Sequence, residues 1–388
     1  MGAYYFSYGL PYDQPPDTVT RRIGFACLMS ILYSHWRLVY NVFMFDIVAI
    51  GSATRDNFLK ADYQLIDWPH TSLKKAIVFP FGEKVEVSDV YSTIGGNAVN
   101  AGVTFARQGF KTACLAKLGD DLAAKELKAR LKTEKVNTKL IVHSKEKSTA
   151  FSVLLLKDGE RTILGYHGAS DTLTLKDINL RRLKSKWWYL SLAGESDSIY
   201  LDLLEFAKKN KIQVAFNPSG HHLRHKKEEI LSSLNDLAFL VLNEDEASIL
   251  TGVSFDQPEK VFRTLDKIVP GIVAVTSGGE GVMVSDNHNL YRAGIFREQK
   301  IVDRTGAGDA FGSGFVSGLM MRSKNKKEID RGKPNFNEDD IKYAIRLASA
   351  NATSVVENLG ATEGILTYKQ FAENQRWANF EIQTIPLS

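Results

Sequence analysis

Cysteine is almost absent from this sequence, with Cys27 and Cys114 as the two thiols among 388 residues. Two thiols cannot form a disulfide framework or a four-thiolate metal site. A reducing cytoplasm is therefore the expected location. Proline is also scarce, with ten residues, and the composition is 44% hydrophobic. Collagen-like, low-complexity and broadly disordered chains are excluded by these values.

No charge of either sign dominates. The 49 Lys and Arg residues face 45 Asp and Glu residues, which gives a formal net charge of +4. This small excess is spread along the chain, so it does not form the basic surface that nucleic acid requires. We expect no nucleic-acid partner. The length allows either two domains or one large α/β domain with an insertion.

A long uninterrupted apolar run is missing too. The first 43 residues begin with an aromatic, proline-containing stretch, and the apolar segment that follows is broken by Arg37 after roughly fourteen residues. A transmembrane helix needs ~20 apolar residues, and a signal peptide places its basic residues first. We therefore expect an N-terminal extension, residues 1–43, without stable membrane insertion. A physiological start at Met44, a membrane-surface anchor and an ordinary extension all stay open.

From Phe45 onward, short apolar runs alternate with helical segments of about 10–15 residues. Residues 45–51 are almost wholly apolar and end at Gly51, as expected for a strand buried on both faces. The alternation continues to about residue 357 and predicts right-handed βαβ units. The predicted fold class is therefore α/β, with a mostly parallel central sheet covered by helices on both faces.

Two stretches break this alternation, residues 57–94 and 145–170, which have strand-like patterns and lack crossover helices. Within the second stretch, Asp158-Gly159 is a hairpin signal. We expect the two stretches to form a small second sheet beside the main one, which would act as a lid. Residues 44–370 would form one domain, and residues 371–388 a C-terminal tail.

The most specific string is DRTGAGD at residues 303–309, directly before an apolar helix. Backbone N–H groups at a helix N-terminus are unpaired and the helix dipole adds partial positive charge, so this turn can bind an anion. Asp309 either stabilises its own helix or acts as a general base toward a substrate hydroxyl. The whole string in its context favours the second role.

Two other places carry candidate binding residues. Gly95 and Gly96 open a predicted helix over 97–108, where either Asn97 caps the helix or a polyol approaches Asn100 one turn further in. Asp56 follows the first strand, at the edge where ligands bind in open α/β sheets. It is either a solvated loop carboxylate or an acceptor for two neighbouring hydroxyls.

A glycine-rich turn at residues 276–281 joins two predicted strands. No Gly-Lys-Ser/Thr follows, so the turn is not a Walker P-loop. It leads into a strand and not into a helix, so it is not a dinucleotide fingerprint either. The turn is suited to backing a nucleotide, and it argues against an NAD enzyme.

These motifs, in this order, resemble those of the ribokinase-like (pfkB-type) carbohydrate and nucleoside kinases, over residues 45 to about 367. Gly95, Gly96 and Asn100 match the N-terminal signature of that family, and residues 303–309 match its C-terminal signature. The resemblance implies a three-layer αβα ribokinase-like fold with a β-sheet lid. It also implies ATP-dependent transfer of a γ-phosphoryl group to the hydroxymethyl of a small sugar, such as ribose, fructose or keto-deoxy-gluconate.

The resemblance also implies a role for each matching residue. The catalytic group would be Asp309 as base with the N–H groups of Gly306, Ala307 and Gly308 as anion hole. Sugar hydroxyls would bind to Asp56, Gly95, Gly96 and Asn100, and the nucleotide to Asn243, Thr276, Gly278, Gly281 and Asn351. Glu246 would serve Mg²⁺ through water or phosphate, and Asp303 and Thr305 would bind an activating K⁺. Arg304 replaces the Thr usual in the family and, by its place in the string, is expected to point away from the catalytic residues.

The acceptor is not identified by these residues. Arg161, on a predicted lid strand, either binds an acidic sugar or is a solvated strand residue. The lid aromatics either stack on a purine, as in an adenosine-type nucleoside kinase, or pack within the lid; they are Tyr63, Trp68, Phe79, Phe81 and Tyr91. A non-catalytic sugar sensor is a third alternative, against which the intact base argues. The unpaired edges of the lid favour a homodimer.

Overall fold

The computed structural model describes residues 45–70, 74–157, 160–323 and 336–387, all within one compact unit, Phe45–Ser388. The expected extension over residues 1–43 and the expected turn at Asp158-Gly159 lie outside the described residues. Within these ranges, no helix has both the length and the apolar character that a bilayer crossing requires.

A nine-stranded sheet forms the centre of this unit, in the order β17-β16-β15-β14-β13-β12-β11-β1-β6. Its strands are β1 (Phe45–Gly51), β6 (Thr112–Leu115), β11 (Ser185–Ser191), β12 (Gln213–Phe216), β13 (Phe239–Asn243), β14 (Ile272–Thr276), β15 (Val282–Ser285), β16 (Asn289–Ala293) and β17 (Gln383–Pro386). Strands β6 through β14 in this order pair in parallel, and β15, β16 and β17 pair antiparallel. The predicted mostly parallel sheet is confirmed.

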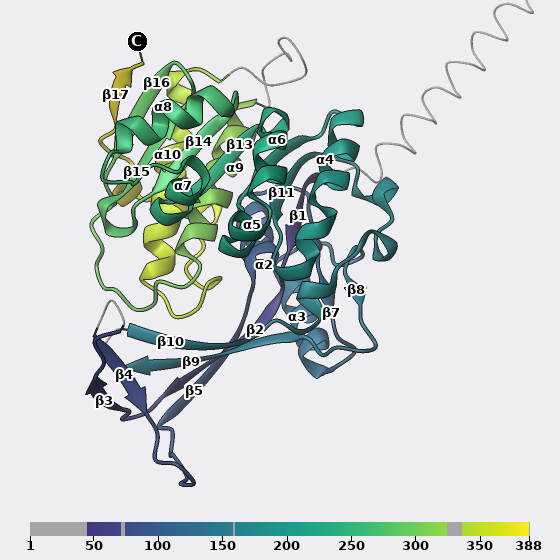
Figure 1. Cartoon of the computed structure of the whole chain (residues 1–388), viewed down its shortest axis with the longest axis vertical. Coiled ribbons are helices and arrows are strands. Elements are labelled where there is room, and N and C mark those ends of the chain that lie inside the picture. Colours follow the sequence, from purple (N-terminus) through teal and green to yellow (C-terminus); the bar gives the residue numbers. More distant parts are fainter. Residues whose placement is uncertain (1–44, 71–73, 158–159, 324–335, 388) are drawn as a thin grey trace, which may run out of the picture. The chain divides into compact units, whose positions relative to one another are not determined.

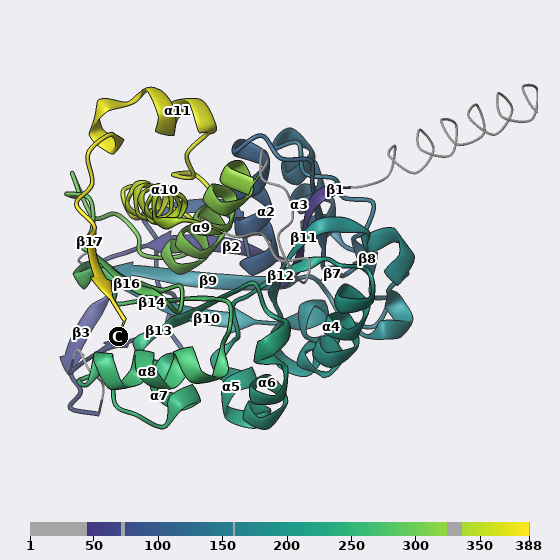
Figure 2. The ribbon, with the colours of Figure 1, turned by 90° about the horizontal axis from the view of Figure 1, so that it is seen from above.

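Helices cover both faces of this sheet, as Figure 2 shows from above. One face carries α2 (Asn97–Arg107), α3 (Leu122–Thr133), α9 (Ala307–Ser323) and α10 (Glu338–Val356); the other carries α4 (Tyr200–Lys209), α5 (Gly220–His225), α6 (Lys227–Ser233), α7 (Glu244–Thr251) and α8 (Pro258–Ile268). Strand β1 shows why both faces are apolar: Ile47 and Ala49 join the first core, while Val48 and Ile50 join the second. Buried alternate residues on both faces are typical of a three-layer α/β fold.

The lid is a separate four-stranded sheet, drawn below the main sheet in Figure 1. Its order is β10-β9-β2-β5, with β2 at Thr54–Lys60, β5 at Asp89–Gly95, β9 at Ala150–Lys157 and β10 at Glu160–Tyr166. A hairpin of β3 (Gln64–Asp67) and β4 (Lys75–Val78) accompanies it, and β7 (Lys117–Leu118) pairs with β8 (Val142–His143). The two predicted β-rich stretches therefore do form a second sheet.

Shorter elements complete the unit. Helix α11 spans Tyr368–Glu373, and 3-10 helices occupy Gly168–Thr172, Leu175–Asp177, Leu180–Leu183, Gly194–Ile199, Leu234–Asp236, Gly278–Glu280 and Gln375–Trp377.

The segment expected as a C-terminal tail is part of the folded unit. Strand β17 pairs antiparallel with β16 and forms one edge of the main sheet. Phe371 and Trp377 are buried in a small cluster with Phe296 and Leu347. The four residues of β17 are too few to show a strand periodicity in the sequence, and its pairing with β16 is a long-range contact.

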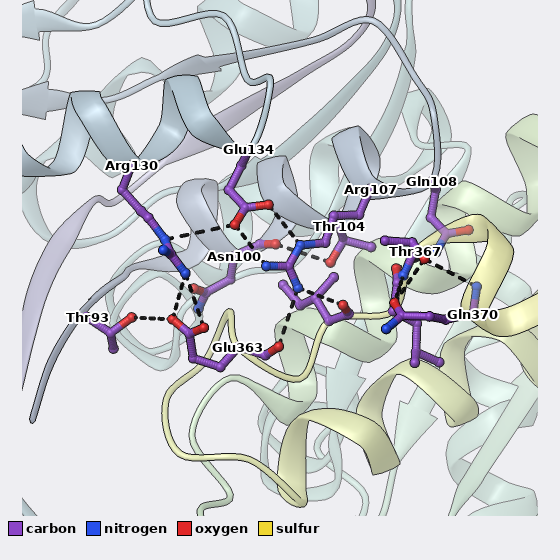
Figure 3. Close-up of polar contacts among 12 residues, drawn as sticks. Thr93, Asn100, Thr104, Arg107, Gln108, Arg130, Glu134, Glu363, Thr367 and Gln370 are labelled. Atoms are coloured by element: carbon purple, nitrogen blue, oxygen red, sulfur yellow. Dashed lines mark hydrogen bonds and ion pairs between the residues drawn. The ribbon is translucent and has the colours of Figure 1, made fainter.

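A polar network fastens helices α2 and α3 and lid strand β5 to the segment after α10 (Figure 3). Arg107 forms a bidentate contact with Glu134, at 2.8 Å from both oxygens, and donates to the carbonyl of Ile365 at 2.7 Å. Glu363 accepts from Arg130 at 3.0 Å and from Thr93 of β5 at 3.1 Å. This network therefore connects the base of the lid to the body of the protein.

Arg107 lowers the pKa of Glu134, chiefly through its hydrogen bond, while burial acts in the opposite direction. A carboxylate with a lowered pKa in the folded state stabilises the protein above its ordinary pKa. That stabilisation is lost as the pH falls through the lower value of the folded protein.

We expect Arg107→Ala to lower the free energy of unfolding by about 2–4 kcal/mol, because it leaves a largely buried carboxylate and a carbonyl without their main partner. Urea unfolding followed by circular dichroism measures this loss. The control is Lys208→Ala, whose pair with Asp236 is exposed and should contribute less than about 1 kcal/mol. Equal losses for the two variants would contradict the structural role of Arg107.

Candidate functional site

The N-terminus of α9 carries the predicted anion-binding turn. Gly306 has a φ of 78°, and a Cβ there would lie 2.5 Å from the Cβ of Ala361, so only glycine fits this close approach. The first helical hydrogen bond runs from the N–H of Ala310 to the carbonyl of Gly306. The N–H of Ala307 contacts the carbonyl of Arg304 at 3.4 Å. The N–H groups of Gly308 and Asp309 are thus first-turn donors without a helical acceptor.

Asp309 is joined directly to the other signature of the sequence. The side-chain amide of Asn100 donates to Oδ2 of Asp309 at 2.9 Å. Asn100 is 3% exposed, and its Oδ1 is a buried acceptor without a partner among the described residues. Burial raises the pKa of Asp309 to about 6, although the Asn100 hydrogen bond acts to lower it. The site therefore contains an oriented carboxylate that titrates near neutral pH.

The glycine pair Gly95-Gly96 brings α2 close to the turn after β1. Gly96 is the N-cap with a φ of 93°, and a Cβ there would lie 2.7 Å from the carbonyl oxygen of Ser52. One of the two expectations made Asn97 the N-cap, and this is wrong. Asn97 is the first helical residue, and its amide donates to the hydroxyl of Ser191 at 2.6 Å. A glycine with positive φ takes the cap position because no side chain fits there.

Asp56 is not a solvated loop carboxylate. It lies within β2 and is 4% exposed, and a Cβ at Gly95 would overlap its carboxylate. Burial raises the pKa of Asp56 to about 6; a hydrogen bond involving Ser152 acts to lower the pKa, and the charge of Asp303 raises it. Asp56 is therefore a second buried carboxylate of the site, held close to the glycine pair.

A cavity of about 210 Å³ opens between α9, α10 and the turn after β14. We call it the α9–α10 cavity. Its lining includes Thr276, Gly278, Gly281, Arg304, Ala307, Gly308, Phe311, Ser349, Ala352 and Thr353. The structure thus brings the predicted glycine-rich turn to the same cavity as the start of α9.

Arg304 also lines this cavity, next to Ala307 and Gly308. The expectation that it points away from the catalytic residues is not supported, since Arg304 lines the same cavity as Ala307 and Gly308. A cation at this place is suited to a polyanionic ligand.

Asn351 does not line the cavity, contrary to the expectation. It is fully buried; its amide donates to the carbonyl of Ala310 at 2.9 Å, and its Oδ1 accepts from the N–H of Leu366 at 2.9 Å. Asn351 therefore connects α10 to α9 and to the following segment. Ser349, Ala352 and Thr353 lie on the cavity side of the same helix, and their small side chains at helical spacing are the signal that sequence reasoning missed.

Asn243 and Glu246 form a capping box at the start of α7. Oδ1 of Asn243 accepts from the N–H of Glu246 at 2.8 Å, and a carboxylate oxygen of Glu246 accepts from the N–H of Asn243 at 2.9 Å. Asn243 is exposed, and neither residue lines the α9–α10 cavity. Burial raises the pKa of Glu246, and the charge of Asp309 also contributes to this rise. Glu246 is therefore within electrostatic reach of Asp309.

Arg161 is half-buried, with 25% of its side chain exposed, and it also lines a lid cavity. Its Nε lies 3.7 Å from Oδ1 of Asp303, which is 3% exposed. The same Oδ1 accepts from the N–H and the hydroxyl of Thr305 at 2.9 and 2.7 Å, and Oδ2 accepts from the N–H of Gly360 at 3.3 Å. Asp303 therefore accepts hydrogen bonds from neutral donors and has a guanidinium beside it, and the K⁺ site that the resemblance implied for Asp303 and Thr305 stays a prediction.

Of the five lid aromatics, Tyr63 is buried, and Trp68, Phe79, Phe81 and Tyr91 are exposed. Tyr63 is buried and meets Phe79 edge to face at 5.8 Å, and Phe81 is fully exposed. Tyr91 alone among the five expected aromatics lines a lid cavity, where Phe58 accompanies it with a ring distance of 6.1 Å. This cavity also contacts Val302 and Leu359, so it faces the loops on either side of the anion-binding turn.

Comparison with known proteins agrees with this geometry. The sequence model described as pfkB family carbohydrate kinase matches residues 46–367. The ribokinase of Haemophilus influenzae is 27% identical over 307 residues, 75% of this chain and 90% of that protein. The cytidine kinase of Thermococcus kodakarensis is 25% identical over 319 residues, 82% and 98% of the two chains. The structure of Arabidopsis thaliana ribokinase with ribose and ATP has a TM-score of 0.64 at 21% identity, covering 84% of this chain and 97% of that one.

Proposed function

Because this chain belongs to the pfkB family of carbohydrate kinases, we propose that it transfers the γ-phosphoryl group of ATP to a hydroxymethyl of a small sugar. The contact between Asn100 and Asp309 carries this proposal. It places the base beside the glycine-pair helix, while Ala307 and Gly308 line the α9–α10 cavity. An acceptor on one side and a nucleotide on the other would meet at residues 306–309. We further propose the cytoplasm as the location, on the scarcity of cysteine.

In this mechanism Asp309 accepts the proton of the acceptor hydroxyl as that oxygen attacks the phosphorus atom. A pKa of about 6 leaves Asp309 mostly ionised at neutral pH. Asn100 fixes the orientation of the carboxylate through its amide, and its free Oδ1 can accept a hydrogen bond from the acceptor. Asp56 would bind neighbouring hydroxyls beside Gly95 and Gly96.

The negative charge of the transferred phosphoryl group would be stabilised by the N–H groups at the start of α9. The helix dipole adds to this effect, and phosphoryl transfer depends mainly on such alignment and charge stabilisation. Arg304 would approach the phosphates of ATP from the cavity wall, while Thr276, Gly278 and Gly281 would contact the nucleoside part. The closed lid would exclude water, which otherwise competes as acceptor.

Mg²⁺ fits this site through phosphate and water. Among the residues that the structure describes, no group of three or more His, Cys, Asp or Glu side chains could hold a metal by itself. Mg²⁺ in kinases usually keeps several waters and uses one or two carboxylates together with substrate phosphates. Glu246, whose pKa is raised in part by the charge of Asp309, would hold such a water. When bound, the ion supplies charge neutralisation on the phosphate oxygens.

For the acceptor, a neutral sugar is favoured and a nucleoside is the second candidate. Arg161 forms an ion pair with Asp303, so part of its charge is already compensated, which disfavours an acidic sugar such as keto-deoxy-gluconate. The specific observation that supports a nucleoside is the lid cavity, in which Tyr91 offers exposed aromatic surface for a base.

An acceptor panel tests the proposed function. We expect ATP-dependent ADP release with ribose or fructose and little with keto-deoxy-gluconate, measured by a coupled assay, with adenosine and cytidine as the nucleoside arm. A preference for a nucleoside would transfer the assignment to the second candidate. Sugar binding in calorimetry without turnover on any acceptor would contradict the kinase proposal and favour a sugar sensor.

Asp309→Asn should lower kcat by about 100-fold or more while circular dichroism shows an unchanged fold, since an oriented general base typically contributes ~10²–10⁴-fold. The wild-type kcat/KM should decrease as the pH falls below about 6, because the base must be ionised. Asp56 has a similar pKa, so a second variant is needed to show which carboxylate causes the pH dependence. Asn100→Leu removes the hydrogen bond that lowers the pKa of Asp309, and the inflection should move to higher pH. A loss below about tenfold for Asp309→Asn would exclude Asp309 as the base.

We also propose that the protein forms a homodimer through the lid. The lid sheet has two open edges, β5 and β10, and its strands expose the large apolar side chains of Val90, Tyr91, Ile163 and Leu164. Open strand edges with exposed apolar residues are prone to pair with another chain.

Sedimentation velocity should show a dimer for the wild type, and Val90→Lys with Leu164→Lys should weaken it by about 100-fold, since two charges would be placed in an apolar contact. Leu201→Lys is the control, because Leu201 is similarly exposed but lies on α4, outside the lid. A wild-type monomer at all accessible concentrations would rule out the dimer.

A further inference from the structure

We propose that Arg161 is a positioning residue, which couples the β9–β10 hairpin of the lid to the anion-binding turn by compensating the buried charge of Asp303. The inference rests on the proposed kinase function. It also assigns to a side chain of this protein the positive charge that a K⁺ ion would otherwise bring to Asp303.

Asp303 carries a buried charge. Its side chain has no exposed surface, and it directly precedes the turn that opens α9. The donors from Thr305 and Gly360 satisfy its oxygen atoms, but they are neutral groups. A buried carboxylate is costly unless an opposite charge accompanies its hydrogen bonds.

The opposite charge comes from the lid. Within the described part of the chain, the cation that forms an ion pair with Asp303 is Arg161. Arg161 belongs to β10, where it pairs with Leu156 of β9 near the end of the lid hairpin. The positive charge therefore comes from the lid, while Asp303 belongs to the body of the protein.

The cation and the carboxylate thus belong to two different parts of the protein, the lid and the body. If the hairpin moves away from the body, Asp303 loses its cation but keeps its buried position. The closed lid is therefore favoured by the charge of Asp303, and the turn at residues 303–308 is held in the conformation that presents the N–H groups of Gly308 and Asp309. The charge of Asp303 also raises the pKa of Asp56, so Asp303 acts on the acceptor side of the site as well.

The test compares the wild type, Arg161→Gln, Asp303→Asn and the double variant. Glu126→Gln is the matched control, because it removes the exposed ion pair that Arg55 of lid strand β2 forms with helix α3. Two readouts are measured in potassium and in choline chloride at equal ionic strength. The first is kcat with KM for ATP; the second is the melting temperature, which does not depend on activity.

We expect wild-type kcat to differ by less than about twofold between the two salts, and Arg161→Gln to lose about tenfold in kcat with KM for ATP changed less than about threefold. The melting temperatures of Arg161→Gln and Asp303→Asn should fall by non-additive amounts, as expected for residues in contact. Glu126→Gln should behave like the wild type in both readouts.

Two results would overturn the inference: a wild-type kcat that depends on potassium by more than about tenfold, or melting-temperature changes that add for the two single variants. If the wild type phosphorylates no acceptor, the proposed function fails, and the melting temperatures still decide whether Arg161 and Asp303 are coupled.

Discussion

The hydrogen bond between Asn100 and Asp309 is the contact on which the rest of the site depends. It joins two helix N-termini that are 209 positions apart in the chain, at a distance of 2.9 Å. Both termini stand on the same face of the main sheet, because α2 and α9 share one core. The packing of this core therefore decides where the carboxylate points, and the raised pKa of Asp309 is a consequence of that burial.

Two glycines with positive φ make this meeting possible. Gly96 lets the start of α2 approach the turn after β1, and Gly306 lets the start of α9 approach Ala361. A side chain at either place would push a helix N-terminus away from the site. The network of Arg107, Glu134 and Glu363 then fixes the segment that carries Ala361, which explains why contacts distant from the chemistry still determine the geometry of the anion-binding turn.

Local sequence patterns predict the fold well, but they do not predict long-range contacts. The strand at residues 45–51, the start of α9 and the second sheet follow from periodicity and turn residues, and each is confirmed. The expectation for Asn351 names the wrong side of α10, because Asn351 is buried in the core and does not line the cavity. A shift of one or two positions along a helix moves a side chain from one side to the other. The alternatives expected for Arg161 did not include its ion pair with Asp303, because the two residues are far apart in the sequence.

Three buried or half-buried carboxylates, Asp56, Asp303 and Asp309, belong to the proposed site, and they differ in how their charge is reduced. Asp56 and Asp309 have pKa values near 6 and can share or accept protons. Asp303 is instead paired with a fixed cation. Burial thus raises the pKa of the two carboxylates on the acceptor side, while the one that precedes the turn has a cation beside it. A site that binds a polyanionic nucleotide needs this separation, because an unpaired charge at Asp303 would repel the phosphate that the helix N-terminus attracts.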